Sequence, residues 1–258
     1  MAAAQEPRWE RDWGAAFNRA RSEGKMVLVD YWASWCEPCR AMEAMVFPSP
    51  VVSERLAGFV LVKVDFDGST IARAHGVTRL PTYTVLDPWQ KERFRFSAFD
   101  KPERFAIKLD LIRAASAGMM EAGRSLSKGE NAEAYLLLGR SYLAAKASID
   151  AREAFERAEK LARDDGKEPL AQTAETRVAL TWVLEGDTAK ALKILGEITR
   201  KPADGECAAG AWLYIGHIER GRQNLAGAAE AYRRALATSA SDSPLRKEAG
   251  TALAAVQK

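Results

Sequence analysis

The chain has 258 residues, of which 47% are hydrophobic and 28% are charged, and its formal net charge is +3. This near-balance argues against a nucleic-acid-binding protein, which usually carries a concentrated basic face. No apolar run reaches the length of a transmembrane helix, and three cysteines are too few for a disulfide scaffold in a chain of this size.

The first 120 residues alternate between segments that predict strands and segments that predict helices. Two predicted strands, at 27–32 and 59–64, are short apolar runs rich in β-branched residues, and two weaker candidates lie at 82–86 and 94–96. The predicted helices lie at 9–23, 38–45, 50–56, 70–75 and 102–124. This alternation predicts an α/β fold in which a sheet is covered by helices.

After about residue 127 the strand-like runs vanish, alanine becomes common, and polar turns such as "KGEN" and "RDDGKEP" separate helical stretches. We therefore predict two domains, at 1–124 and 125–258, and expect the second to be all-helical. A last amphipathic helix is predicted at 244–256.

The second domain repeats a spacing of small and aromatic residues. Equivalent positions recur after about 40 and 37 residues, and the middle copy is the weakest. The three copies are Tyr135, Leu138, Gly139, Tyr142, Ala151, Phe155 and Ala158; Val178, Ala179, Trp182, Ala191, Leu195 and Ile198; and Trp212, Ile215, Gly216, Ala228, Tyr232 and Ala235. This pattern resembles the tetratricopeptide repeat, whose period is about 34. The resemblance implies about three stacked helix pairs with a capping helix, and a groove that could bind a protein or peptide.

Two cysteines, Cys36 and Cys39, lie two residues apart in "VDYWASWCEPCRAME". A C-x-x-C pair can be half of a metal site, but such a site needs more ligands. The other candidates, Cys207, His75 and His217, are single and scattered, so we predict no metal.

The same spacing suits a redox couple at the start of a helix. The free N–H groups there stabilise a thiolate on Cys36, and one helical turn brings Cys39 close enough to bond to it. Pro38 fits the first turn, where its missing N–H has no intrahelical partner. We expect Cys36 to be the nucleophile, and Cys39 to be the more shielded thiol that resolves the mixed disulfide.

The segment "VLVDYWASWCEPC" contains an apolar strand with a buried acid, followed by W-C-x-P-C, and it resembles the thioredoxin signature. The agreement covers most of residues 9–120. The resemblance implies a thioredoxin fold, with a central mixed sheet flanked by helices. It also implies that Asp30 is a buried carboxylate of raised pKa that takes a proton from Cys39. Lys63 matches the lysine that pairs with this acid.

"GVTRLPTY" matches the thioredoxin segment that carries a cis-proline against the disulfide, with Pro81 as the proline. The resemblance implies that the Leu80 backbone pairs with an extended substrate strand. It also implies that Trp35 covers the disulfide face and that Trp32 packs beneath it.

Glu37 stands where ordinary thioredoxins have glycine. A carboxylate there disfavours the Cys36 thiolate and makes the couple more reducing, although solvent screens much of the effect. The "MVFPSPVVSERLAGFVLVKVDFD" segment resembles the extracytoplasmic thioredoxin-like domain of membrane reductant conductors more than it resembles cytosolic thioredoxin. "AAAQ" at residues 2–5 is typical of a processed signal-peptide boundary. A periplasmic or secreted location is therefore favoured, and a cytoplasmic one stays open.

These features predict a thiol–disulfide oxidoreductase, chiefly a protein-disulfide reductase, with a potential nearer that of thioredoxin, about −270 mV, than that of a strong oxidant. The oxidase and isomerase directions stay open. It would act on disulfide-containing proteins in cell redox homeostasis, be reset by an upstream electron donor, and need no cofactor beyond its Cys36–Cys39 dithiol. The alternative is a non-catalytic chaperone or adaptor that binds clients through its repeats.

Overall fold

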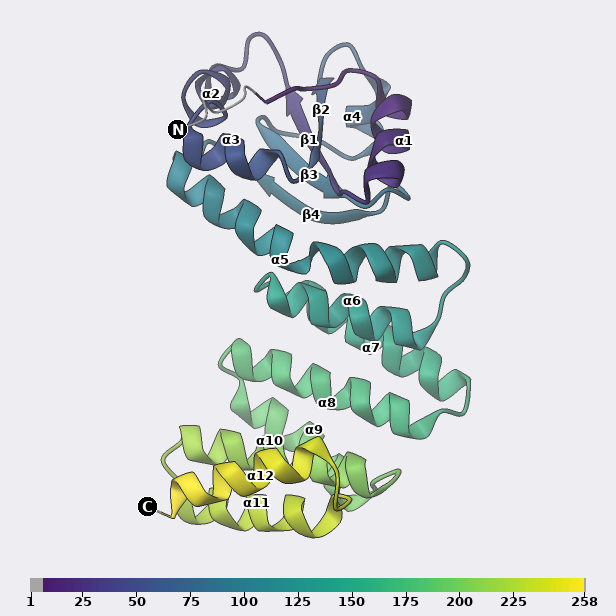
Figure 1. Cartoon of the computed structure of the whole chain (residues 1–258), viewed down its shortest axis with the longest axis vertical. Helices are drawn as coiled ribbons and strands as arrows, with labels where there is room; N and C mark the ends of the chain where they lie inside the picture. Colours follow the sequence, from purple (N-terminus) through teal and green to yellow (C-terminus); the bar gives the residue numbers. More distant parts are fainter. Residues whose placement is uncertain (1–6, 258) are drawn as a thin grey trace. The chain divides into compact units, whose positions relative to one another are not determined.

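A computed structural model describes residues 7–257 (Figure 1), so the "AAAQ" segment lies outside the described residues. The chain divides into two compact units. The first runs to Gly129 and takes in Ala144–Lys146, and the second contains Glu130–Leu143 and the rest of the chain from Ala147. Between residues 7 and 257, no helix is both long enough and apolar enough to span a membrane.

The first unit is built on a four-stranded mixed sheet in the order β2-β1-β3-β4. Its strands are β1 (Val27–Trp32), β2 (Val60–Asp65), β3 (Thr82–Leu86) and β4 (Glu92–Ser97). The central strand β1 is parallel to β2 and antiparallel to β3, and β3 and β4 form an antiparallel hairpin. This is the mixed sheet expected of the thioredoxin fold.

Helices cover both faces of this sheet (Figure 1). They are α1 (Trp13–Glu23), α2 (Glu37–Ala41), the π-helical turn η1 (Met42–Val46), α3 (Pro50–Leu56), α4 (Thr70–Ala74) and α5 (Pro102–Leu126). Successive side chains of a strand point to opposite faces. Val29 and Tyr31 of β1 therefore pack in one core cluster with residues of α1 and α4, and Asp30 points to the opposite face.

Two predicted helices differ from the observed ones. The first begins at Trp13, because the Asp12 carboxylate caps it by accepting from the Ala15 N–H at 2.9 Å. Glu10, predicted to be helical, instead pairs with Val62 and extends the sheet beyond β2. The helix predicted at 38–45 is broken into α2 and the π-helical turn η1.

The second unit is all-helical, as predicted. Its helices are α6 (Ala132–Ala144), α7 (Ser148–Asp164), α8 (Glu168–Leu184), α9 (Thr188–Arg200), α10 (Gly205–Gly221), α11 (Leu225–Thr238) and α12 (Pro244–Val256). The first six form three consecutive pairs, and α12 packs on α11 through Ala249 and Ala252. The arrangement fits helical repeats.

Glycines let the paired helices approach closely. A Cβ atom on Gly139 of α6 would lie 2.4 Å from the ring of Phe155 on α7, and one on Gly216 of α10 would lie 2.4 Å from the ring of Tyr232 on α11. These are equivalent positions of the first and third pairs, so the glycine–aromatic spacing read from the sequence marks real contacts.

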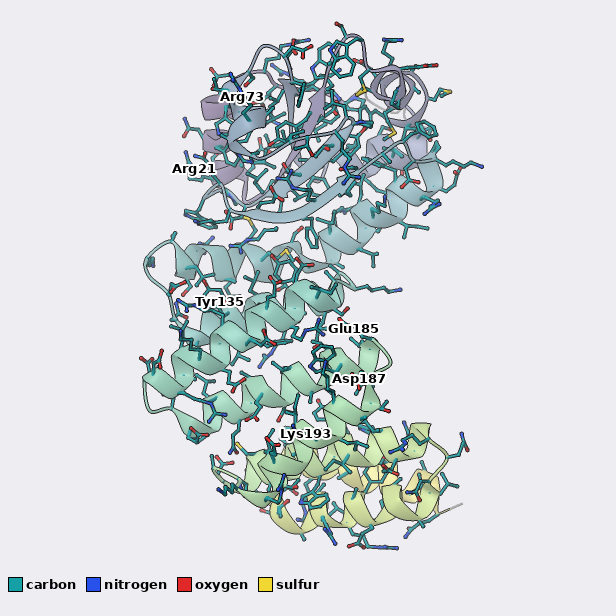
Figure 2. All side chains as sticks on the ribbon, turned by 180° about the vertical axis from the view of Figure 1, so that it is seen from behind. Arg21, Arg73, Tyr135, Glu185, Asp187 and Lys193 are labelled. Atoms are coloured by element: carbon teal, nitrogen blue, oxygen red, sulfur yellow. A yellow bond between two sulfur atoms is a disulfide. The ribbon has the colours of Figure 1, made fainter. Side chains whose placement is uncertain are left out.

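Polar turns fix the ends of these helices. Glu185 and Asp187 lie in the turn between α8 and α9 (Figure 2). Asp187 caps α9 by accepting from the Lys190 N–H at 3.0 Å. Glu185 accepts a hydrogen bond from Arg152 of α7 at 2.8 Å. The turn is thereby tied to the preceding pair.

Candidate functional site

The two cysteines of the C-x-x-C segment form a disulfide at the N-terminus of α2. Cys36 is the N-cap residue, and its Sγ accepts from the Cys39 N–H at 3.2 Å. Pro38 occupies the first turn, as predicted. The N-terminus of this helix therefore aims an N–H group at the sulfur of Cys36, which is the arrangement that stabilises a thiolate.

Both cysteines are almost fully buried in the oxidised state. Cys36 is 3% exposed and Cys39 is 5% exposed. In this state the two cysteines are shielded alike, because Trp32, Phe66 and Leu80 pack around both, and the greater shielding of the Cys39 thiol stays a prediction for the dithiol. The two cysteines differ in hydrogen bonding, because the sulfur of Cys36 accepts a hydrogen bond from the backbone N–H of Cys39 in the first turn of the helix.

An exposed tryptophan stands beside the disulfide. Trp35 is 62% exposed, so it offers a broad apolar surface next to the sulfurs. Its indole Nε1 donates to Asp67 Oδ2 at 2.6 Å, and its ring meets Phe66 edge-on at 6.4 Å. The Trp35 ring is therefore fixed in place by two neighbours that follow β2.

The loop before β3 closes another side of the site. The Leu80–Pro81 peptide bond is cis, and the Leu80 side chain contacts the cysteine cluster. The Thr82 hydroxyl donates to the Arg79 carbonyl at 2.8 Å and so holds this loop in shape. Glu37, between the two cysteines, is exposed.

Asp30 is a buried carboxylic acid on the face of β1 away from α1. It is 3% exposed, and its Oδ1 atom has no hydrogen-bond partner among the described residues. Burial raises the pKa of the Asp30 carboxyl from 3.8 to about 7. The charge of Lys63 opposes this rise in pKa, and that of Glu43 adds to it.

Lys63 lies opposite Asp30 on the neighbouring strand β2. Its ammonium, however, makes its ion pair with Glu43 Oε1, at 2.7 Å, and lies 4.4 Å from the centre of the Trp32 ring. Among the described residues this is the only ion pair of Lys63. The expected direct pairing with Asp30 is therefore corrected: Lys63 acts on Asp30 through its charge, and Glu43 is its partner.

Glu43 is a residue of the site that the sequence patterns did not predict. It lies four residues after Cys39, a spacing that places both on one side of a helix. That spacing was the available signal. The π-helical turn that carries Glu43 had no counterpart in the predicted helix.

The third cysteine is separate from this site. Cys207 lies in the second unit, and burial raises the pKa of its thiol to about 12, with Asp204 adding to the effect. Across residues 7–257, the structure groups no three His, Cys, Asp or Glu side chains where a metal ion could bind.

Comparisons with known proteins agree with this geometry. A family model described as thioredoxin-like matches residues 8–88. An H-type thioredoxin of Fagopyrum esculentum is 33% identical over 85 residues, which cover 31% of this chain and 68% of that protein. A thioredoxin of Coprinus comatus is 33% identical over 76 residues, which cover 29% of this chain and 71% of that protein.

Two further likenesses differ in how much of each protein they cover. The thiol:disulfide interchange protein DsbD of Pseudomonas fluorescens is 40% identical over 73 residues, which cover 28% of this chain and only 12% of that protein. Among solved structures, a thioredoxin from Thermus thermophilus is 26% identical with a TM-score of 0.41, and the match covers 44% of this chain and 92% of that one.

Proposed function

The chain belongs to the thioredoxin-like family, and on this premise we propose that it reduces disulfide bonds in partner proteins through Cys36 and Cys39. The observation that carries the proposal is the disulfide itself, held at the N-terminus of α2 beside the cis-proline loop. The coarser activity, thiol–disulfide exchange, follows from family membership together with this cysteine pair.

In the first step the Cys36 thiolate attacks one sulfur of a partner disulfide. A bond forms between Cys36 and that sulfur, the partner's disulfide breaks, and its other sulfur leaves as a thiolate that takes a proton from water. The hydrogen bond from the Cys39 N–H, with the other N–H groups of the first turn, stabilises the attacking thiolate. The product is a mixed disulfide.

In the second step Cys39 gives up its proton and attacks Cys36. The Cys36–Cys39 bond forms, the bond to the partner breaks, and the partner leaves with its second thiol. Two electrons have passed to the partner, and an upstream donor restores the dithiol.

We assign Asp30 as the acceptor of the Cys39 proton, directly or through water. A general base works best when its pKa lies near the operating pH, and burial brings the pKa of Asp30 to about 7. An ordinary exposed aspartate, with a pKa near 3.9, would be a much weaker base.

Partner proteins are held by surfaces around the sulfurs. The Leu80 backbone would pair with an extended segment of the partner, and the exposed ring of Trp35 would pack against it. Glu37, which is exposed, would tune the couple towards reduction. The reducing direction is supported by the thioredoxin relatives and by the W-C-x-P-C form of the motif.

The helical unit would recruit the partners. We propose that its helix pairs are tetratricopeptide-like and that their surface binds a protein segment, because three pairs and a closing helix give a long repeated face. The functional division at residues 1–124 and 125–258 lies a few residues before the junction at Gly129.

Insulin reduction tests this proposal. With dithiothreitol as the electron donor, the wild-type protein should speed the precipitation of insulin B chains well above the rate of a Cys36→Ser, Cys39→Ser double variant. Equal rates for the two proteins would overturn the reductase assignment.

A further inference from the structure

The second unit contains a hollow that runs along α8, α10 and the start of α12. It consists of two adjoining cavities of about 430 and about 90 Å³. The residues that line both cavities are Thr173, Glu206, Cys207 and Leu245. Because four residues are shared, the two cavities form one continuous surface depression.

One end of this hollow is cationic. Arg177 of α8 lines the smaller cavity, and its Nη1 atom donates to the Tyr214 hydroxyl of α10 at 3.1 Å. Among the described residues Arg177 has no carboxylate within ion-pair distance. A guanidinium has five N–H donors in a fork that matches a carboxylate. The Arg177 end is therefore suited to an anion.

The larger cavity has apolar side chains in its lining. Leu170 of α8, Cys207 of α10 and Leu245 of α12 line it, and all three are partly or largely buried. Gly210 of α10 lines the adjoining smaller cavity next to Leu245. This stretch is suited to one large apolar side chain.

The other end is acidic. Asp204, at the start of α10, lines only the larger cavity, and Glu206 lines both cavities. Asp204 caps α10 by accepting from the Cys207 N–H at 2.7 Å. Glu206 accepts from the Ala240 N–H at 2.7 Å and from the Ser243 hydroxyl at 2.6 Å. Both carboxylates are held by neutral donors, so their negative charge is not cancelled and favours a cation.

A fixed length of α10 lies between the backbone of Glu206 and the backbone of Tyr214, whose hydroxyl accepts from Arg177. Glu206 and Tyr214, the partner of Arg177, lie eight residues apart on α10, which corresponds to about 12 Å at about 1.5 Å per residue. An extended peptide covers that distance in about four residues.

We propose that this hollow binds a short segment of a partner protein in which a large apolar side chain lies between an acidic and a basic residue. The acid bonds Arg177, the apolar side chain fills the space between Leu170 and Leu245, and the basic residue lies against Asp204 and Glu206. This specifies the partner-binding role proposed above for the helical unit, on which it rests.

Selection from a random heptapeptide library that lacks cysteine tests the assignment. The immobilised full-length protein is used in its oxidised form without reductant, so binding is read independently of disulfide exchange. Selected peptides should carry an acidic and a basic residue within about four positions, with a large apolar residue between them. No enrichment, or enrichment without the acidic residue, would overturn the proposal.

Matched arginine variants locate the contact on the protein. The best peptide should bind Arg177→Gln about tenfold or more weakly, because a hydrogen-bonded charge pair is lost. Arg177→Lys should restore part of the affinity. Arg140→Gln is the control, since Arg140 is exposed on α6, does not line the hollow and has no carboxylate partner among the described residues. Equal losses at Arg140 and Arg177 would count against the site.

The two proposals can fail separately. Peptide selection with no insulin reduction would leave the hollow intact as a binding site and remove the reductase role. Insulin reduction without peptide selection would keep the redox activity and remove this binding site.

Discussion

Replacing Asp30 by asparagine should stabilise the oxidised protein at alkaline pH. The folded protein holds the proton of Asp30 up to about pH 7, whereas the unfolded chain releases it near the ordinary pKa of 3.8. Between these values the unfolded state binds fewer protons, so the wild-type protein loses stability as pH rises through this window. Asparagine does not ionise, so the stability of the Asp30→Asn variant does not fall in this way as the pH rises.

The magnitude follows from the two pKa values. A tenfold change in an acid constant is worth about 1.4 kcal/mol, so a pKa raised from 3.8 to about 7 corresponds to about 4 kcal/mol. The advantage of Asp30→Asn in the free energy of unfolding should be near zero below pH 4. It should grow between pH 4 and pH 7, and level off at about 4 kcal/mol above pH 7.

Urea unfolding of the full-length oxidised protein at a series of pH values measures this difference. The transition of the first unit is the one that shifts when the disulfide is reduced. Asp110→Asn is the control, because Asp110 is 46% exposed in an ion pair with Arg55, and its loss should cost less than about 1 kcal/mol. An Asp30→Asn advantage that does not change with pH, or a loss of stability at pH 8, would refute the reasoning.

Three other substitutions test the electrostatics around Asp30 and the packing of the helix pairs. Glu43→Gln should lower the pKa of Asp30, because the charge of Glu43 raises it, whereas Lys63→Met should raise that pKa further. Carboxyl carbon chemical shifts followed by NMR across pH 4–9 report both, and shifts in the same direction would contradict this electrostatic picture. Gly139→Ala should destabilise the second unit by about 1–3 kcal/mol, because the added methyl group meets the ring of Phe155. Thermal unfolding measures this change, and an unchanged melting temperature would show that the two helices separate at little cost.

Much of the first unit could be predicted from short-range sequence patterns. The observed β1 and β3 have the predicted bounds, because apolar β-branched runs mark buried strands clearly. The edge strand β4 is longer than predicted, since it includes the charged Arg93. That arginine is buried because its guanidinium pairs with Asp87 at 2.6 Å. No local sequence pattern predicts this pairing.

The sequence predicts which residues form the site better than it predicts which of them contact one another. The cysteines and Asp30 have fixed places in a familiar motif, and the structure shows the cysteines bonded and the acid buried. The partner of Lys63 could not be predicted, because it depends on the π-helical turn that carries Glu43.

The measurement that tests the central claim most directly is the capture of a mixed disulfide with insulin. Reduced Cys39→Ser protein should accumulate a covalent adduct through Cys36, because the second step is blocked, and mass spectrometry of the tryptic peptide identifies the linked cysteine. Reduced Cys36→Ser protein should accumulate little or none. An adduct formed equally through Cys39, or none from either variant, would contradict the assignment of Cys36 as the nucleophile.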